Sequence, residues 1–161
     1  MHRGIAVSPD GKTLAVDAER GGILFIDVRT YAQIGDPLPL KDSGLGSLAY
    51  SPDGRTLAVG GDHVLRLFDA RTRKQLAEAA VNGAAMRTAF TKDGSKVIVV
   101  VAPSPSGQDL GGADAQITIR DAATLEPIGG RPIEPEAFVG AYVGVWYASP
   151  QFAVTPDDRF L

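Results

Sequence analysis

A turn motif recurs along the sequence and restricts the possible folds more than any other feature. The segment 8–16, SPDGKTLAV, returns at 51–59 as SPDGRTLAV. A looser copy, TKDGSKVIV, spans 91–99, and a fourth copy begins at 155–161 as TPDDRFL. The turn aspartates of these copies lie 43, 40 and 64 residues apart. Because self-similarity at a period of about 40 residues is typical of repeat architectures, we expect one structural unit used several times.

A second motif, Asp-x-x-Thr, occurs in phase with the first, at 27–30, 69–72 and 121–124. In the Pro-Asp-Gly motif, proline presets φ to about −65°, Asp can bond the backbone ahead and Gly tolerates positive φ, so the motif predicts a tight turn. The carboxylate of Asp-x-x-Thr can accept backbone N–H bonds in the same way. Structural turn roles are therefore assigned to Asp10, Gly11, Asp53, Gly54, Asp93, Gly94, Asp27, Asp69 and Asp121.

Each unit is predicted to contain four short strands. In the first unit the candidates are 4–7, 12–17, 23–26 and 31–35, which are separated by Gly, Pro and Asp. The first strand of each unit carries alanine on one face and larger apolar residues on the other, which suits a tapered sheet buried on both sides. No segment shows the period of about 3.6 residues that a helix requires.

Four strands in a unit of 40 to 43 residues resemble the WD40 and related YVTN-type β-propeller repeats, over essentially the whole chain. The resemblance implies an all-β fold, a partial β-propeller of about 3.5 four-stranded antiparallel blades. The family's Gly-His pair is missing, and its Trp-Asp ending is replaced by Ile26-Asp27, Phe68-Asp69 and Arg120-Asp121. The blades are therefore of the degenerate type common in bacteria, similar to propellers at the C-terminal end of bacterial signalling ATPases and transcriptional regulators.

The expected WD40-like propeller region spans 1–161, with blades at 4–40, 46–81 and 86–130 and the start of a fourth at 149–161. Closed propellers need about four to eight blades. We therefore expect a piece of a longer protein whose further blades close the ring, or a half-propeller that closes by self-association.

Two insertions, 103–114 and 131–148, interrupt the third unit, and propeller topology places both on the face opposite the Pro-Asp-Gly turns. Extra loops on one face of a repeat scaffold are where binding usually resides. The second insertion holds an aromatic cluster that could anchor a protein partner, since Trp and Tyr dominate binding hot spots. Its members are Phe138, Tyr142, Trp146 and Tyr147. The alternative is that these rings cover the top of the barrel or continue a strand. Asp109 and Asp114 of the first insertion are too few to predict a calcium site.

The remaining signals mostly exclude functions. A net charge of −3 predicts no nucleic-acid binding by this segment, and no apolar run is long enough to predict a membrane span. The chain has no cysteine, and its two histidines, His2 and His63, occur outside any metal or catalytic motif. No catalytic, cofactor-binding or metal-binding residue is therefore predicted, no cofactor is expected, and a cytoplasmic location is the default expectation.

These observations favour a non-catalytic protein–protein interaction or scaffolding module, the sensory or binding part of a larger bacterial regulatory protein. The alternative is a fragment of an enzymatic β-propeller, a lactonase-like hydrolase or quinoprotein-type dehydrogenase with its active site in other blades. Such enzymes carry metal or cofactor ligands on their inner strands. Here those strands carry mostly Ile, Val, Leu, Tyr, Phe and Ala, which favours the interaction module.

Overall fold

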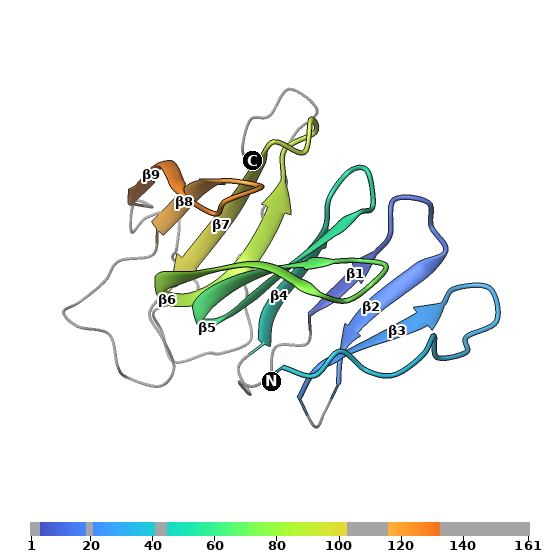
Figure 1. Ribbon diagram of the computed structural model, residues 1–161. Helices are drawn as coiled ribbons and strands as arrows, with labels where there is room; N and C mark the ends of the chain where they lie inside the picture. The colour runs from blue at the N-terminus through green and yellow to red at the C-terminus, as the bar shows by residue number, and fades with distance from the viewer. Residues whose placement is uncertain (1–3, 19–20, 41–44, 103–115, 133–161) are drawn as a thin grey trace.

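A computed structural model describes residues 4–18, 21–40, 45–102 and 116–132, and these ranges contain strands and turns but no helix (Figure 1). All strand pairs are antiparallel, in two sheets ordered β1-β2-β3 and β4-β5-β6-β7-β8-β9. The strands are β1 Ile5–Val7, β2 Thr13–Asp17, β3 Ile23–Asp27, β4 Leu45–Tyr50, β5 Thr56–Asp69, β6 Gln75–Phe90, β7 Lys96–Ala102, β8 Gln116–Asp121 and β9 Pro127–Pro132. The all-β antiparallel fold predicted from the repeats is confirmed.

Strand β5 folds back on itself and supplies two neighbouring strands. Its first half pairs with β4, and its second half pairs with β6. The N–H of Ala70 donates to the carbonyl of Arg55 at 2.8 Å, so the two ends of β5 lie side by side. A straight strand of this length would hold its ends about 40 Å apart. His63, with a φ of 57°, lies at the reversal, where a left-handed conformation suits a tight hairpin.

Strand β6 joins two blades. Its first half pairs with β5 through Val64↔Ala80, and its second half pairs with β7 from Ala84↔Ala102 to Phe90↔Val97. The second half also lies against β4, because the Ser47 hydroxyl donates to the carbonyl of Ala85 at 3.1 Å. The outer strand of one blade thus continues directly as the innermost strand of the next.

The described residues therefore form three blades. Blade 1 holds β1, β2 and β3; blade 2 holds β4, both halves of β5 and the first half of β6; blade 3 holds the second half of β6 with β7, β8 and β9. The inner strands β1, β4 and the second half of β6 are neighbours in that order (Figure 1). This arrangement is a partial β-propeller of antiparallel blades, as the sequence predicts.

Of the fourth strand expected at 31–35 in blade 1, only the isolated bridge Ile26↔Gln33 is present, and a second isolated bridge, Ile23↔Leu38, follows beyond it. Gly35 adopts a left-handed φ of 64°, and Pro37 has no N–H to donate. The pairing is therefore interrupted between the two bridges. It resumes at Leu38, which exchanges two hydrogen bonds of 2.9 Å with Ile23.

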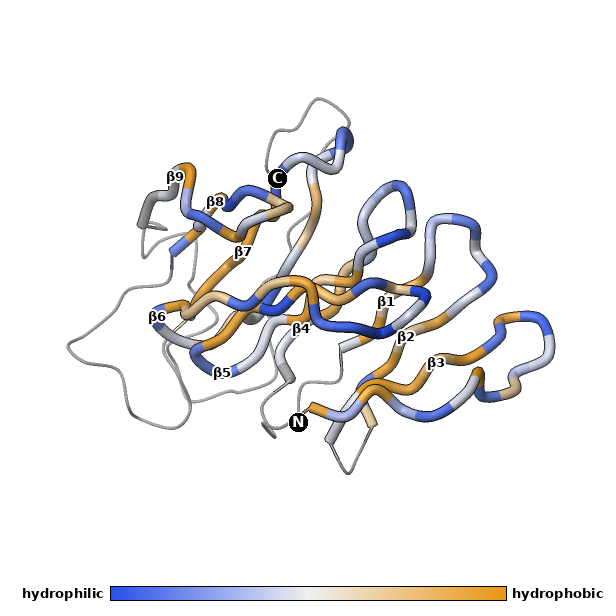
Figure 2. Tube along the Cα trace, viewed as in Figure 1, coloured by the Kyte–Doolittle hydropathy of each residue, from blue (hydrophilic) through white to orange (hydrophobic). Residues whose placement is uncertain are grey.

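The hydrophobic core consists of two layers, each between two blades. Leu57 faces the layer between blades 1 and 2, Ala58 faces the layer between blades 2 and 3, and both are fully buried. Because alternate residues of a strand face opposite sides, blade 2 is buried on both of its faces. Figure 2 shows hydrophobic residues along the strands and hydrophilic ones in the connecting turns.

Candidate functional site

The three Pro-Asp-Gly-type turns close through the same hydrogen bonds to one carboxylate. In blade 1, Asp10 accepts at Oδ1 from the Ser8 hydroxyl at 2.6 Å and from the Lys12 N–H at 3.0 Å. The equivalent bonds join Asp53 to Ser51 and Arg55, at 2.6 and 3.0 Å, and Asp93 to Thr91 and Ser95, at 2.6 and 2.9 Å. In each turn the hydroxyl bond is the first cause of a lowered carboxyl pKa.

Asp93 is the most strongly held of these carboxylates, because the Ser95 hydroxyl also donates to its Oδ2 at 2.7 Å. Hydrogen bonds from Thr91 and Ser95 lower the pKa of Asp93 to about 2. A group bonded in this way stays ionised at neutral pH and holds its turn. It is poorly suited to act as a general acid there.

The turns of consecutive blades also touch one another. Gly11, Gly54 and Gly94 all adopt a left-handed φ, of 71°, 71° and 72°. A Cβ placed on Gly54 would lie 3.4 Å from Cδ of Pro9, and one on Gly94 would lie 3.5 Å from Cδ of Pro52. The proline of one turn therefore packs beside the glycine of the next, so each turn contributes to a contact between blades.

The Asp-x-x-Thr turns use the same principle and lie beside the Pro-Asp-Gly turns, since the N–H groups of Val28, Ala70 and Ala122 donate to the carbonyls of Lys12, Arg55 and Ser95. Asp27 accepts at Oδ1 from the N–H of Arg29 at 3.0 Å, and from the N–H and hydroxyl of Thr30 at 2.7 and 2.9 Å. The turns at Asp69 and Asp121 repeat these bonds. The threonine N–H is the first cause of the lowered pKa of all three carboxyls.

In blades 2 and 3, the residue that follows the threonine contacts the preceding blade, and sequence reasoning missed this position. Tyr31, Arg73 and Leu125 occupy this position with nearly identical left-handed φ values of 59°, 60° and 61°. Leu125 is 1% exposed in the layer between blades 2 and 3, whereas Tyr31 is 84% exposed. The three side chains differ in chemistry, so only their shared place after Asp-x-x-Thr could have identified them.

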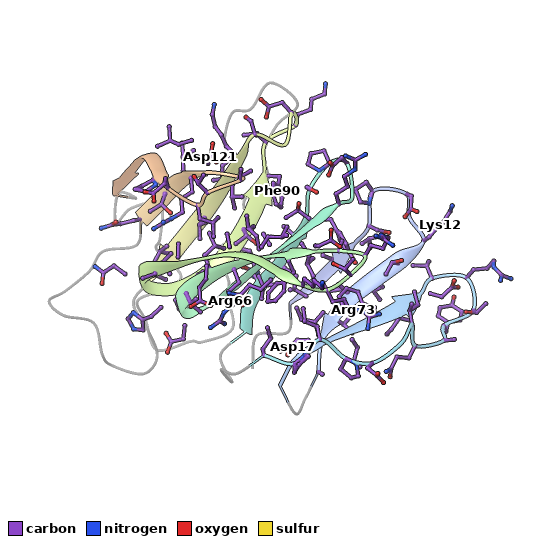
Figure 3. All side chains as sticks on the ribbon, viewed as in Figure 1. Lys12, Asp17, Arg66, Arg73, Phe90 and Asp121 are labelled. Atoms are coloured by element: carbon purple, nitrogen blue, oxygen red, sulfur yellow. The ribbon has the colours of Figure 1, made fainter. Side chains whose placement is uncertain are left out.

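Two arginines connect blades across their outer strands. The Arg73 guanidinium lies beside the β2–β3 hairpin of blade 1 (Figure 3), where it donates to the carbonyls of Ile34 and Asp36. Arg120 of β8 donates to the carbonyl of Ala80 in blade 2 at 3.1 Å and to that of Leu125 at 2.8 Å. The bonds to Ile34, Asp36 and Ala80 satisfy carbonyls of the preceding blade's last strand segment and so join neighbouring blades.

A hollow of about 400 Å³ opens on the turn face between blades 2 and 3. It is lined by Ser51, Pro52, Asp53, Thr56, Phe90, Lys92, Asp93, Gly94 and Ala122. Its two carboxylates are the turn aspartates described above, so their bonding capacity is partly taken up within the turns.

Within the described ranges, no three His, Asp or Glu side chains are grouped so that they could hold a metal ion. Among these same residues, no helix has the length and apolar character needed to cross a bilayer. The predicted partner-binding residues Phe138, Tyr142, Trp146 and Tyr147 lie outside the described residues, as do Asp109, Asp114 and the expected fourth blade at 149–161.

Comparison with known proteins supports the same architecture. The family WD domain, G-beta repeat matches residues 39–69, which contain β4 and β5. Hydrazine synthase of Kuenenia stuttgartiensis has a similar structure, with a TM-score of 0.66 and 17% identity over 81% of this chain and 36% of that one. The chain thus spans about a third of that protein's length, and at this identity the likeness concerns the fold alone. A comparison of the sequence with curated proteins gave no match.

Proposed function

We propose that this chain, which forms part of a WD40-like β-propeller, is a non-catalytic protein-interaction module. The observation that carries the proposal is the way its repeated acidic residues are used. Each turn aspartate accepts hydrogen bonds within its own turn and holds that turn in a fixed shape. The repeated turn aspartates therefore stabilise a rigid scaffold. A binding surface built from loops requires such a scaffold.

The inner strands support the same function over the enzymatic alternative. Propeller enzymes of the lactonase or quinoprotein type need metal or cofactor ligands around the central channel. Strand β1, strand β4 and the second half of β6 carry no His, Asp or Glu. Their polar members include Ser47 and Thr88, which bond each other across blades 2 and 3 at 3.3 Å.

The strand topology supports a contact surface on the face opposite the Pro-Asp-Gly turns. Lys96 begins β7 beside a turn, so Ala102, where β7 ends, lies at the opposite face. Gln116 pairs with Pro132, which places the start of β8 and the end of β9 at that face too. The stretch 103–115 and the stretch that follows 132 therefore both leave the scaffold on one side. We propose that the aromatic residues Phe138, Tyr142, Trp146 and Tyr147 contribute to a contact surface on that side.

We further propose that the module is the sensory or binding part of a larger bacterial regulatory protein of the cytoplasm, with another protein as its partner. Degenerate WD40-like units that lack the Gly-His and Trp-Asp pairs support this assignment, because they resemble the propellers of such regulators.

The experiment compares Trp146→Ala with Leu76→Ala in a pull-down from bacterial lysate with the full chain as bait. Leu76 is a matched apolar control, 57% exposed on the outer rim of blade 2. The proposal expects Trp146→Ala to lose at least one protein that the wild type and Leu76→Ala both retain. Equal capture by a Trp146→Ala protein with wild-type circular dichroism would remove the aromatic cluster from the proposed surface.

A further inference from the structure

An Asn-Gly pair lies where strand β6 passes from blade 2 to blade 3. Asn82 is the only asparagine of the sequence, and Gly83 follows it. The ladder with β5 includes Ala80 and Ala84 but none of the residues between them, and the ladder with β7 begins at Ala84. Asn82 is exposed, and Gly83 has a positive φ of 126°. The pair therefore occupies an irregular corner between two regular strand segments.

The packing of β7 against this corner requires glycine at position 83. A Cβ on this residue would lie 2.3 Å from the carbonyl oxygen of Ala102, so a side chain has no room there. Glycine also leaves its own nitrogen unhindered, because it has no side chain beside the amide carbon of the preceding asparagine. The close approach of β7 thus places next to Asn82 the residue that least hinders attack on its side chain.

We propose that Asn82 is a site of spontaneous deamidation. The Gly83 nitrogen loses its proton and forms a bond to Cγ of Asn82, and the side-chain nitrogen leaves as ammonia. Water then opens the cyclic imide. Opening between the Gly83 nitrogen and Cγ gives aspartate, and opening between that nitrogen and the backbone carbonyl carbon gives isoaspartate. Either product carries at neutral pH a negative charge that Asn82 lacks.

The three Asp-Gly pairs of the Pro-Asp-Gly-type turns have the sequence for the same imide, but their turns oppose it. An aspartate forms the imide by losing water from a protonated carboxyl, whereas the amide of Asn82 is neutral already. Hydroxyl hydrogen bonds lower the pKa of the three turn carboxyls and keep them ionised. Each glycine N–H is also held by a backbone carbonyl. These bonds join Gly11 to Ser8, Gly54 to Ser51 and Gly94 to Thr91, at 2.8, 2.9 and 2.9 Å.

Isoaspartate changes the connection between blades 2 and 3. Its main chain runs through Cβ and Cγ of the former side chain, which lengthens the backbone by a methylene group between Asn82 and Gly83. Gly83 has no room to move toward Ala102, and Ala84 is fixed by pairing with both Asp62 and Ala102. We therefore expect the longer backbone to displace the two halves of β6 relative to each other and to lower the stability of the chain.

The first test follows the folded chain by peptide mass after incubation at mildly alkaline pH. Trypsin releases residues 75–87 as one peptide, because Lys74 precedes it and Arg87 ends it. We expect this peptide to gain the mass that separates an acid from an amide, to resolve into aspartate and isoaspartate forms, and to release ammonia. The matched variant Asn82→Gln, whose longer side chain requires a larger ring, is expected to keep its mass.

Two controls make this test decisive. The free peptide 75–87, incubated in parallel, gives the rate without the fold, and an unchanged Asn82 in the folded chain after the free peptide has converted would overturn the proposal. The peptides that contain Asp10, Asp53 and Asp93 are expected to stay free of isoaspartate. Isoaspartate formed there as fast as at Asn82 would contradict the special position of the Asn-Gly pair.

The second test separates the added charge from the longer backbone. Asn82→Asp carries the charge in a main chain of ordinary length. We expect the aged wild-type protein, which contains isoaspartate, to unfold at a lower temperature than Asn82→Asp, and Asn82→Asp to stay near the fresh wild type. Equal unfolding temperatures for aged wild type and Asn82→Asp would show that the corner accepts the longer backbone, contrary to the proposed effect on the connection between blades.

Discussion

The Arg73 guanidinium lies 4.4 Å from the centre of the Phe25 ring, although the two residues belong to different blades. The same guanidinium donates to the carbonyls of Ile34 and Asp36 at the outer edge of blade 1. One side chain therefore covers an aromatic ring of blade 1 and satisfies two backbone acceptors near it. The contact makes Arg73 a connection between the two sheets that the hydrogen-bond ladder leaves separate.

Replacing Arg73 by alanine is expected to lower the free energy of unfolding by about 1 to 3 kcal/mol, through loss of the cation–π contact and of two charged hydrogen bonds. Both residues have a Cβ, so the left-handed backbone adds no difference. Urea titration followed by circular dichroism measures the change. Arg71→Ala, an exposed neighbour in the same turn, is expected to stay within about 0.5 kcal/mol of wild type, and an equal loss in both variants would rule out a specific role for Arg73.

Gly60→Ala is expected to destabilise the boundary between blades 2 and 3 by about 1 to 3 kcal/mol, as overpacking of a filled core does. A Cβ at this position would lie 2.5 Å from the Ser47 hydroxyl oxygen and 2.7 Å from the carbonyl oxygen of Ala85. Gly129→Ala is the matched control, because a Cβ there meets nothing within 4 Å. The control is expected to leave stability unchanged or slightly raised. Similar stabilities for the two variants would mean that the inner strands are not packed this closely.

Leu125→Ala is expected to cost about 2 to 5 kcal/mol, because it removes a side chain that is 1% exposed between blades 2 and 3. The same substitution at Leu76, which is 57% exposed, provides the comparison. Thermal unfolding of both variants tests the expectation. A small effect at Leu125 would indicate that blade 3 does not rest on blade 2 through this turn.

Stability is expected to fall as the pH falls from about 4 to 2, because the turn carboxylates have lowered pKa values in the folded chain. A group whose folded pKa is depressed stabilises the protein above its unfolded value and loses that contribution as the pH falls through the folded value. For Asp93 the window lies between the ordinary aspartate pKa of 3.8 and the folded pKa of about 2. Asp93→Asn, which keeps an oxygen acceptor but no charge, should reduce the slope of the unfolding midpoint against pH. An unchanged slope would show that Asp93 does not contribute.

The repeats allowed the fold to be predicted because their turn chemistry is local. Proline, Asp and Gly at 52–54 specify a turn whatever surrounds them, and a Thr at the end of Asp-x-x-Thr does the same. Two turn types that recur in phase, with alternating apolar residues between them, strongly favour a fold in which each repeat forms a four-stranded unit. The fourth strand of blade 1 was wrongly predicted as continuous, because the left-handed Gly35 and the missing donor of Pro37 interrupt it.

The contacts between blades could not be predicted in the same way, because they join residues far apart in the chain. Arg73 and Phe25 are brought together only when two sheets pack at a particular angle. The position after Asp-x-x-Thr is occupied by Tyr31, Arg73 and Leu125, so it carries no residue signature. The three residues share a left-handed backbone conformation, which is a property of the folded blade.

The most direct test of the packed-blade arrangement is a double-mutant cycle on Arg73 and Phe25, with Arg73→Ala, Phe25→Leu and the pair measured by urea unfolding. Leucine keeps the buried apolar volume while removing the ring that the guanidinium covers. If consecutive repeats pack side by side as blades, we expect a coupling free energy of about 0.5 to 1 kcal/mol between Arg73 and Phe25. Strictly additive effects, with no coupling, would contradict the packing of blade 2 on blade 1.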